Sequence, residues 1–164
     1  MENLIYLSVL FINMVFCSSE TKEIESGEGI RHDDFQYIVS SYAVSKQIGS
    51  VQAANKNYYM VHFKVVNNAV RVSHSWDNAV AYLTDEQGNV YENQPLLQAE
   101  LQKVSPFNLK DRYITQFQTS DTTVFVFEVP KDIKNPYLMV RGETLMGDFF
   151  DGNQFRKTKV KLFD

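Results

Sequence analysis

Apolar and polar residues alternate with a period of two along much of the chain after residue 35. In residues 59–66 one set, Tyr59, Val61, Phe63 and Val65, alternates with a second set, Met60, His62, Lys64 and Val66. A period of two places successive side chains on opposite faces of a β-strand. The pattern therefore predicts a strand whose first set faces a core and whose second set mostly faces solvent.

Several further stretches have strand composition and are separated by turn residues. Besides residues 59–66, strands are predicted at 36–46, 79–84, 89–92, 113–118, 123–129, 137–141 and 157–163. Val124 and Val126 alternate with Phe125, Phe127 and Val129, which indicates a central strand buried between layers. Residues 85–89 (DEQGN) predict a hairpin with Gly88 at a positive φ. About eight short strands joined by turns are typical of a β-sandwich.

One stretch departs from the period of two. Residues 96–103 are good helix formers, and they follow Pro95, a residue suited to the first turn of a helix. The sequence therefore predicts one short helix, near residues 95–103, which crosses from one sheet to the other.

The first 34 residues carry a different pattern. Residues 4–17 (LIYLSVLFINMVFC) are almost unbroken apolar sequence, shorter than the roughly 20 residues of a membrane span and typical of a secretory signal peptide. Residues 20–34 hold six acids and two bases, a net charge of −4, which equals the formal charge of the whole chain. Such a segment has little apolar surface to bury. We expect a signal peptide at 1–19, a flexible acidic linker at 20–34 and one folded domain at 35–164.

Cys17 closes the apolar run and is followed by two serines. A cysteine at this place resembles the lipobox of bacterial lipoproteins, in which the signal is cut before a cysteine that becomes lipidated. Cleavage after Ser19, with small residues at positions −3 and −1, is the alternative. Either route exports the domain, as a lipid-anchored protein of the cell envelope or as a secreted or periplasmic protein.

Composition and motifs narrow the classes of function. The single cysteine excludes an internal disulfide and a cysteine-based zinc cluster, and a pI of about 5.4 argues against nucleic acid as a partner. His32, His62 and His74 lack the spacing of a metal-binding helix, although His62 and His74 could meet across strands. The chain contains no nucleophile elbow and no phosphate-binding loop. We expect no enzyme, no metal and no cofactor, with a metal-binding protein or enzyme as the second alternative.

Two features are candidates for contact with a ligand. Trp76 is the only tryptophan, and it is either a core residue or an exposed stacking platform for a sugar or peptide. Lys157, Lys159 and Lys161 share one face of the last predicted strand. They either protect an edge strand from aggregation or bind an acidic partner. The aromatic content of 13% raises a first alternative function, the binding of a carbohydrate or another small ligand.

Four segments resemble a family of exported domains. They are residues 57–68 (NYYMVHFKVVNN), 81–88 (AYLTDEQG), 123–130 (TVFVFEVP) and 137–140 (YLMV). This series of strands and turns resembles secreted bacterial domains of unknown function that have a telokin-like, immunoglobulin-like fold. It is similar to the mycobacterial immunoprotective extracellular antigen family. The resemblance spans about residues 36–163; it implies an exported, often envelope-associated domain and supplies no catalytic residues.

These observations predict an all-β, immunoglobulin-like β-sandwich with one short helix, exported from a bacterial cell. We expect a non-catalytic binding domain of the cell envelope whose partner is a protein or an envelope component. If Cys17 is lipidated, the domain also meets the membrane through its lipid anchor.

Overall fold

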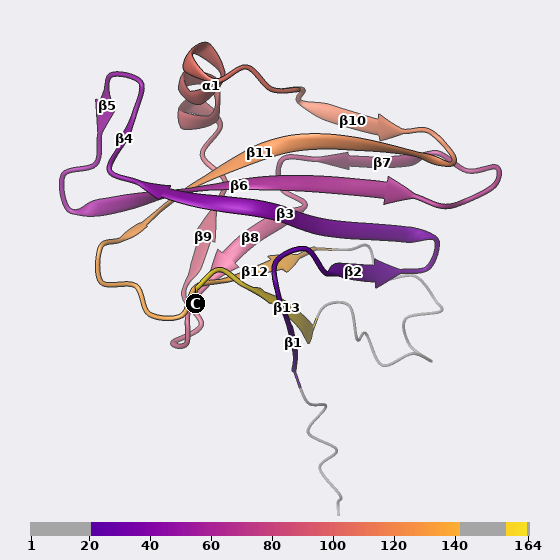
Figure 1. Ribbon diagram of the computed structural model, residues 1–164, viewed down its shortest axis with the longest axis horizontal. Coiled ribbons are helices and arrows are strands. Elements are labelled where there is room, and N and C mark those ends of the chain that lie inside the picture. The colour runs from indigo at the N-terminus through magenta and orange to yellow at the C-terminus, as the bar shows by residue number, and fades with distance from the viewer. Residues whose placement is uncertain (1–20, 142–156, 164) are drawn as a thin grey trace, which may run out of the picture.

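The three longest strands lie side by side in one antiparallel sheet (Figure 1). They are β3 (Phe35–Ser45), β6 (Lys56–Asn67) and β11 (Thr119–Pro130), and β2 (Gly29–His32) extends the sheet to the order β11–β6–β3–β2. The computed structural model describes residues 21–141 and 157–163.

A second, five-stranded sheet packs against the first. Its order is β1 (Lys22–Ile24), β13 (Thr158–Lys161), β12 (Tyr137–Val140), β8 (Ala81–Thr84) and β9 (Val90–Glu92). The remaining elements are the strand pair β7 (His74–Asp77) and β10 (Arg112–Thr115), the hairpin of β4 (Gln47–Ile48) and β5 (Val51–Gln52), and the helix α1 (Pro95–Val104). The expected β-sandwich with a short helix near 95–103 is confirmed.

The main core fills the space between the two sheets. The inward side chains of β6 are the predicted set, Tyr59, Val61, Phe63 and Val65, and all four are buried. Phe125 and Phe127 of β11 pack beside them from the neighbouring strand. The period of two therefore identified the buried face of this strand correctly.

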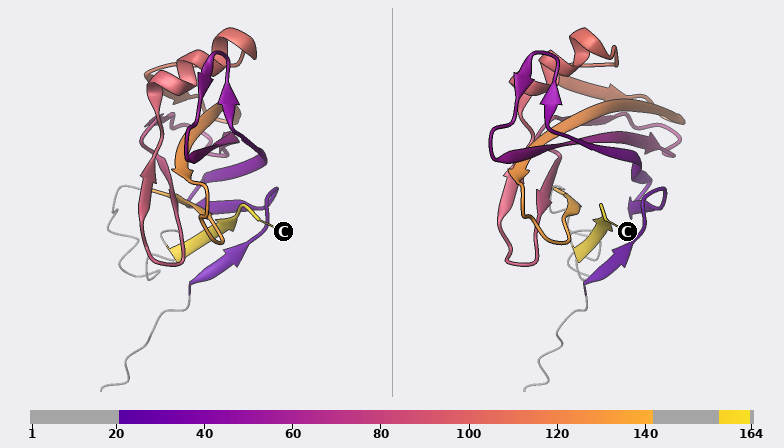
Figure 2. Two further views of the ribbon diagram at one scale, coloured as in Figure 1. Left: turned by 90° about the vertical axis from the view of Figure 1, so that its left-hand side faces the viewer. Right: turned by 60° about the vertical axis from the view of Figure 1, so that its left-hand side comes forward.

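A smaller second core lies on the outer face of the same sheet. Val124 and Val126 of β11 pack there with Leu101 of α1 and Ile48 of β4. Figure 2 shows α1 and the β4–β5 hairpin standing together at one end of the molecule. This covering explains why β11 is apolar on both faces. The expectation of a central strand is wrong, however, because β11 forms the edge of its sheet.

Side-chain amides satisfy the backbone along this outer edge of β11. The Val126 N–H donates to Asn93 Oδ1 (2.9 Å), and Gln98 Nε2 donates to the Val124 carbonyl (2.8 Å). Asn93 Nδ2 in turn donates to Gln98 Oε1 (3.0 Å), and the Gln94 N–H donates to the Val126 carbonyl (2.8 Å). Gln98 is fully buried, so its amide replaces the missing neighbouring strand.

The expectation of a flexible linker over residues 20–34 is wrong where the segment forms two strands. Residues 22–24 and 29–32 form β1 and β2, and Ile24 and Ile30 are buried in the main core. The prediction rested on the average composition of the segment, which is highly charged, and so it gave no weight to these two isoleucines. The predicted signal peptide, residues 1–19, and Cys17 lie outside the described residues.

No helix within the described ranges is long and apolar enough to cross a membrane.

The predicted hairpin at residues 85–89 is present, with Gly88 at φ 80°. Its buried Asp85 carboxylate accepts hydrogen bonds from the backbone of Gln87 (3.0 Å) and Asn89 (2.9 Å), from the Asn89 amide (2.8 Å) and from the Tyr91 hydroxyl (2.9 Å). Burial acts to raise the pKa of Asp85, but these four donors outweigh it and hold the pKa below its usual value.

Replacing Gln98 with leucine should expose the cost of an unsatisfied strand edge. Gln98→Leu keeps the helix propensity and the volume but leaves the Val124 carbonyl and the Asn93 amide without partners. We expect the free energy of unfolding to fall by about 2–3 kcal/mol in urea melts. Gln102→Leu is the control, since Gln102 lies on the same helix and makes one part-buried bond to Phe107. An equal loss in both variants would contradict the assignment.

Asp85 should make stability depend on pH in the acid range. Its folded pKa is lowered, so its contribution is complete above the unfolded pKa, near 4, and is lost as pH falls through the folded pKa. Asp85→Asn should lower the free energy of unfolding at pH 7 by about 1.5–3 kcal/mol. The difference from the parent protein should shrink as pH falls below about 4. The exposed Asp111→Asn serves as control, and a gap that stays constant with pH would refute this role.

Candidate functional site

A cleft of about 520 Å³ opens along β7. Its lining comes from β2, β3, β7 and β10, together with Arg141, which directly follows β12. Phe35, Tyr37, His74 and Trp76 supply an aromatic wall, and Arg112 and Arg141 supply two guanidinium groups. These residues come from segments that are distant in sequence, so no local motif marks the cleft.

Trp76 is a core residue that borders the cleft. Its ring stacks on Tyr113, with centroids 4.0 Å apart and planes at 8°, and its Nε1 donates to Thr115 Oγ1 (2.9 Å). Thr115 Oγ1 donates onward to Asp121 (2.9 Å). Only 5% of Trp76 is exposed. An exposed stacking platform at Trp76 is therefore wrong, and the core role is correct.

Tyr37 and His74 form a hydrogen-bonded pair in the cleft wall. His74 Nε2 lies 2.9 Å from the Tyr37 hydroxyl oxygen, and the His74 ring stacks on Phe35 at a centroid distance of 4.0 Å. Burial raises the pKa of Tyr37 to about 12. The hydroxyl is therefore neutral at physiological pH and can act as a hydrogen-bonding group of the wall.

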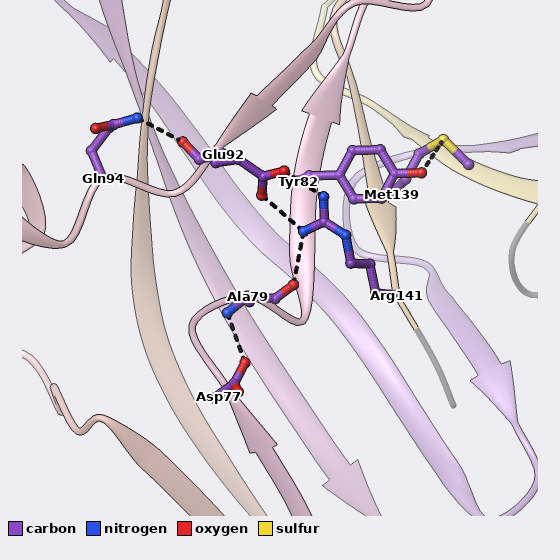
Figure 3. Close-up of polar contacts among 7 residues, drawn as sticks. All are labelled: Asp77, Ala79, Tyr82, Glu92, Gln94, Met139 and Arg141. Atoms are coloured by element: carbon purple, nitrogen blue, oxygen red, sulfur yellow. Dashed lines mark hydrogen bonds and ion pairs between the residues drawn. The ribbon is translucent and has the colours of Figure 1, made fainter. Parts of the chain in front are cut away.

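The two arginines of the cleft differ in what surrounds them. Arg141 donates to both carboxylate oxygens of Glu92 (2.6 and 2.8 Å) and to the Ala79 carbonyl (2.9 Å), and it lies over the Tyr82 ring (Figure 3). The exposed Arg112 donates through Nε to Ser75 Oγ (2.6 Å). No ion pair of Arg112 occurs among the described residues. Arg141 is thus neutralised and fixed, whereas Arg112 can contact a ligand.

Four exposed apolar side chains lie on β10 and on loops next to segments that line the cleft. Val70, Val72, Ile114 and Phe117 are each between 50% and 68% exposed. They lie on β10 and on the loops after β6 and β10, which reach the same end of the molecule (Figure 1). Asn67 Nδ2 ties these loops together, because it donates to the carbonyls of Val72 (2.7 Å) and Thr115 (3.1 Å). We call these four side chains the apolar mouth. The sequence analysis did not distinguish them: Ile114 and Phe117 fall in the strand predicted at 113–118, and Val70 and Val72 fall outside the predicted strands.

The lysines of the last strand do not lie on a sheet edge. Lys157, Lys159 and Lys161 alternate with the buried Thr158, Val160 and Leu162 as the pattern indicates, but β1 pairs with β13 and covers its edge. Lys161 forms an ion pair with Glu25 (2.9 Å), and Lys159 lies over the Tyr137 ring. The expectation of edge lysines is therefore wrong.

The structure keeps the two strand histidines apart. His62 is exposed on the outer face of β6, whereas His74 packs against Phe35 in the cleft wall. Within residues 21–141 and 157–163, no group of three or more histidine, cysteine or acidic side chains is placed to hold a metal ion.

Comparison with known proteins relates the chain to others by fold. No protein-family model and no curated protein sequence matches it. Solved structures that are similar in fold include three from different bacteria. The secreted protein MPT63 of Mycobacterium tuberculosis aligns with TM-score 0.55 and 15% identity over 77% of this chain and 94% of that chain. An uncharacterized β-sandwich protein of Clostridium difficile aligns with TM-score 0.53 and 14% identity over 88% and 95%.

A putative lipoprotein of Bacillus subtilis aligns with TM-score 0.50 and 16% identity over 77% of this chain and 34% of that chain. At these identities the likeness concerns the fold alone. The β-sandwich that the sequence resemblance implied is thus confirmed, and this chain shares its fold with a secreted mycobacterial protein and with part of a putative lipoprotein.

Proposed function

We propose that this chain is an exported, non-catalytic binding domain that receives an apolar side chain of a partner protein in the cleft beside β7. The observation that carries the proposal is the position of Val72, which lines the cleft and also belongs to the apolar mouth. Exposed apolar side chains gathered around a concave site are typical of protein interaction surfaces.

A protein partner suits this surface better than a free small molecule. The cleft volume of about 520 Å³ would accommodate a small ligand. Such a ligand would, however, leave Val70, Ile114 and Phe117 in water, because they stand outside the cleft lining. A protein could fill the cleft with one side chain and cover the apolar mouth with its surface. Arg112 could then pair with an acidic group at the rim.

The chemistry of the cleft supports binding. The Tyr37 hydroxyl is neutral and buried, and the histidine that it contacts, His74, is stacked on Phe35. A carbohydrate site would need an exposed aromatic face, and Trp76, the residue proposed for it, is buried. The carbohydrate alternative therefore lacks the feature on which it depended.

Site-specific photo-crosslinking in the cell envelope tests the proposed interface. A photoreactive residue at Val72 or Phe117 should give a discrete protein adduct, because both positions belong to the apolar mouth. The same residue at Leu96 should give none. Leu96 is the matched control, since it is apolar, 84% exposed and located on α1, at the other end of the long strands (Figure 1).

A charge placed in the apolar mouth should abolish the adduct. In a protein that carries the photoreactive residue at Val72, Ile114→Glu should lower the yield of the crosslinked adduct at least about tenfold. Binding would bury an unpaired carboxylate, which is costly. Unchanged thermal unfolding would show that this variant folds. Equal adducts at Val72 and Leu96, or adducts that survive Ile114→Glu, would contradict the proposal.

We propose further that the domain is exported and that Cys17 carries a lipid anchor. Support comes from the apolar run before this cysteine and from fold neighbours described as a secreted protein and a putative lipoprotein. Cells fed a clickable fatty acid should label the parent protein, and Cys17→Ala should remove the label because Cys17 is the only cysteine. Ser18→Ala is the control and should keep it. Labelling that persists in Cys17→Ala would refute the anchor.

A further inference from the structure

We infer that one edge of β3 pairs with the same edge of a second copy of this chain. We call residues 40–45 the free β3 edge. β2 pairs only with residues 35–38, and the Gly27 N–H then donates to the Val39 carbonyl (2.7 Å). Beyond Val39, β6 is the sole strand neighbour of β3 among the described elements (Figure 1). None of residues 40–45 lines the cleft, so the inference is independent of the proposed protein interface.

The free β3 edge is open to solvent on both of its faces. Ser41 and Ala43 point outward and are exposed. Val44 is opposite Tyr59 of β6, so it points toward the side of the main core, and yet it is 48% exposed. Successive side chains of a strand point to opposite faces. The exposure of Ala43 and of its neighbour Val44 therefore shows that no described segment lies against this part of the strand.

The strand lacks the features that usually keep an exposed edge apart from other strands. Exposed edges in natural proteins are commonly protected by lysine, by proline or by a bulge. Residues 35–45 (FQYIVSSYAVS) contain no charged residue and no proline. The register shift lies between Val39 and Ser41, so residues 41–45 pair regularly with β6. They form a regular, uncharged edge that can accept another strand.

The sequence of this edge is complementary to itself. Two copies related by a two-fold axis at Ala43 pair antiparallel, with Tyr42 of each copy opposite Val44 of the other. Such inward pairs cover Val44, and aromatic and β-branched side chains pair favourably across strands. On the outer face Ala43 meets its own copy, and Ser41 meets Ser45. These residues are small and uncharged, so no bulky or like-charged pair opposes this register.

Opposite charges meet at both ends of this pairing. Lys46 of one copy falls opposite Ser40 of the other, one position from Val39. The turn at residues 25–28, which is hydrogen-bonded to Val39, carries the exposed Glu28. Neither Lys46 nor Glu28 forms an ion pair within the described ranges. A second copy supplies the complementary charge at each end, which favours it over an unrelated strand.

Disulfide crosslinking in cells that produce the full chain tests the pairing. Ala43→Cys places two thiols at the two-fold axis, with Cα atoms about 4.5–5.5 Å apart, a separation that suits a disulfide. Treatment with a permeable oxidant should convert most of the protein to a covalent dimer. Ser41→Cys is the matched control, since Ser41 is exposed on the same face of the same strand. Its two copies lie about 13 Å apart in this register. It should therefore give no more dimer than the parent protein, whose single cysteine is Cys17.

Further substitutions in the Ala43→Cys protein examine the side chains of the interface. Val44→Lys should lower the dimer yield at least about tenfold, because a lysine on an edge strand opposes pairing. Lys46→Glu should also lower the yield, and Glu28→Lys added to Lys46→Glu should restore it. Unchanged thermal unfolding would confirm that these variants fold.

The outcomes that would overturn the inference are specific. No dimer from Ala43→Cys, or as much dimer from Ser41→Cys, would exclude the pairing. So would a disulfide from Ala43→Cys to a different protein, a dimer yield that survives Val44→Lys, or a charge reversal at Lys46 that Glu28→Lys fails to rescue.

Discussion

The outer edge of β11 is the constraint from which much of the architecture follows. This strand is buried on both faces yet has a neighbouring strand on only one side, so its outer N–H and C=O groups would lie buried without partners. The amides of Asn93 and Gln98 meet that need. To do so, the chain after β9 must pass along the edge and begin α1 there, which brings Leu101 onto Val124 and Val126 and builds the second core. The helix is therefore placed by hydrogen bonds at the strand edge as well as by apolar packing.

The opposite side of the molecule is organised by aromatic stacking. The β7–β10 pair is not hydrogen-bonded to the five-stranded sheet, so its position depends on side chains. Trp76 and Tyr113 stack on each other and anchor the pair through Thr115 and through Thr123, which accepts from the Tyr113 hydroxyl (2.8 Å). Because this pair stands apart from the other strands of its layer, a cleft remains along β7. The same separation leaves Ile114 and the neighbouring loops exposed as the apolar mouth.

Turn residues predicted the 85–89 hairpin, and helix-forming residues predicted the helix after Pro95. Alternation along a strand reveals which side chains are buried, and it was sufficient for β6. It does not reveal which strand is at an edge, and β11 therefore looked central although amide side chains close its edge. The average charge of residues 20–34 similarly suggested a flexible linker, although Ile24 and Ile30 of this segment are buried in the main core. The cleft could not be predicted because Phe35, Trp76 and Arg141 meet only in the folded chain. β7 was missed since it has four residues, of which only Trp76 is buried.

The fold, rather than the composition, decides which charged side chains of this chain lie next to one another. Sequence alone directed attention to Lys157, Lys159 and Lys161 and assigned the acidic N-terminal segment to a tether. In the folded protein that segment supplies β1, whose parallel pairing with β13 brings Glu25 to Lys161. Burial, together with the hydrogen bond from Tyr137 to Glu23, raises the pKa of that tyrosine, so a second acid of the segment also lies against this sheet. Lys161 therefore faces an acid of its own chain, a pairing that the charge pattern of the sequence alone did not show.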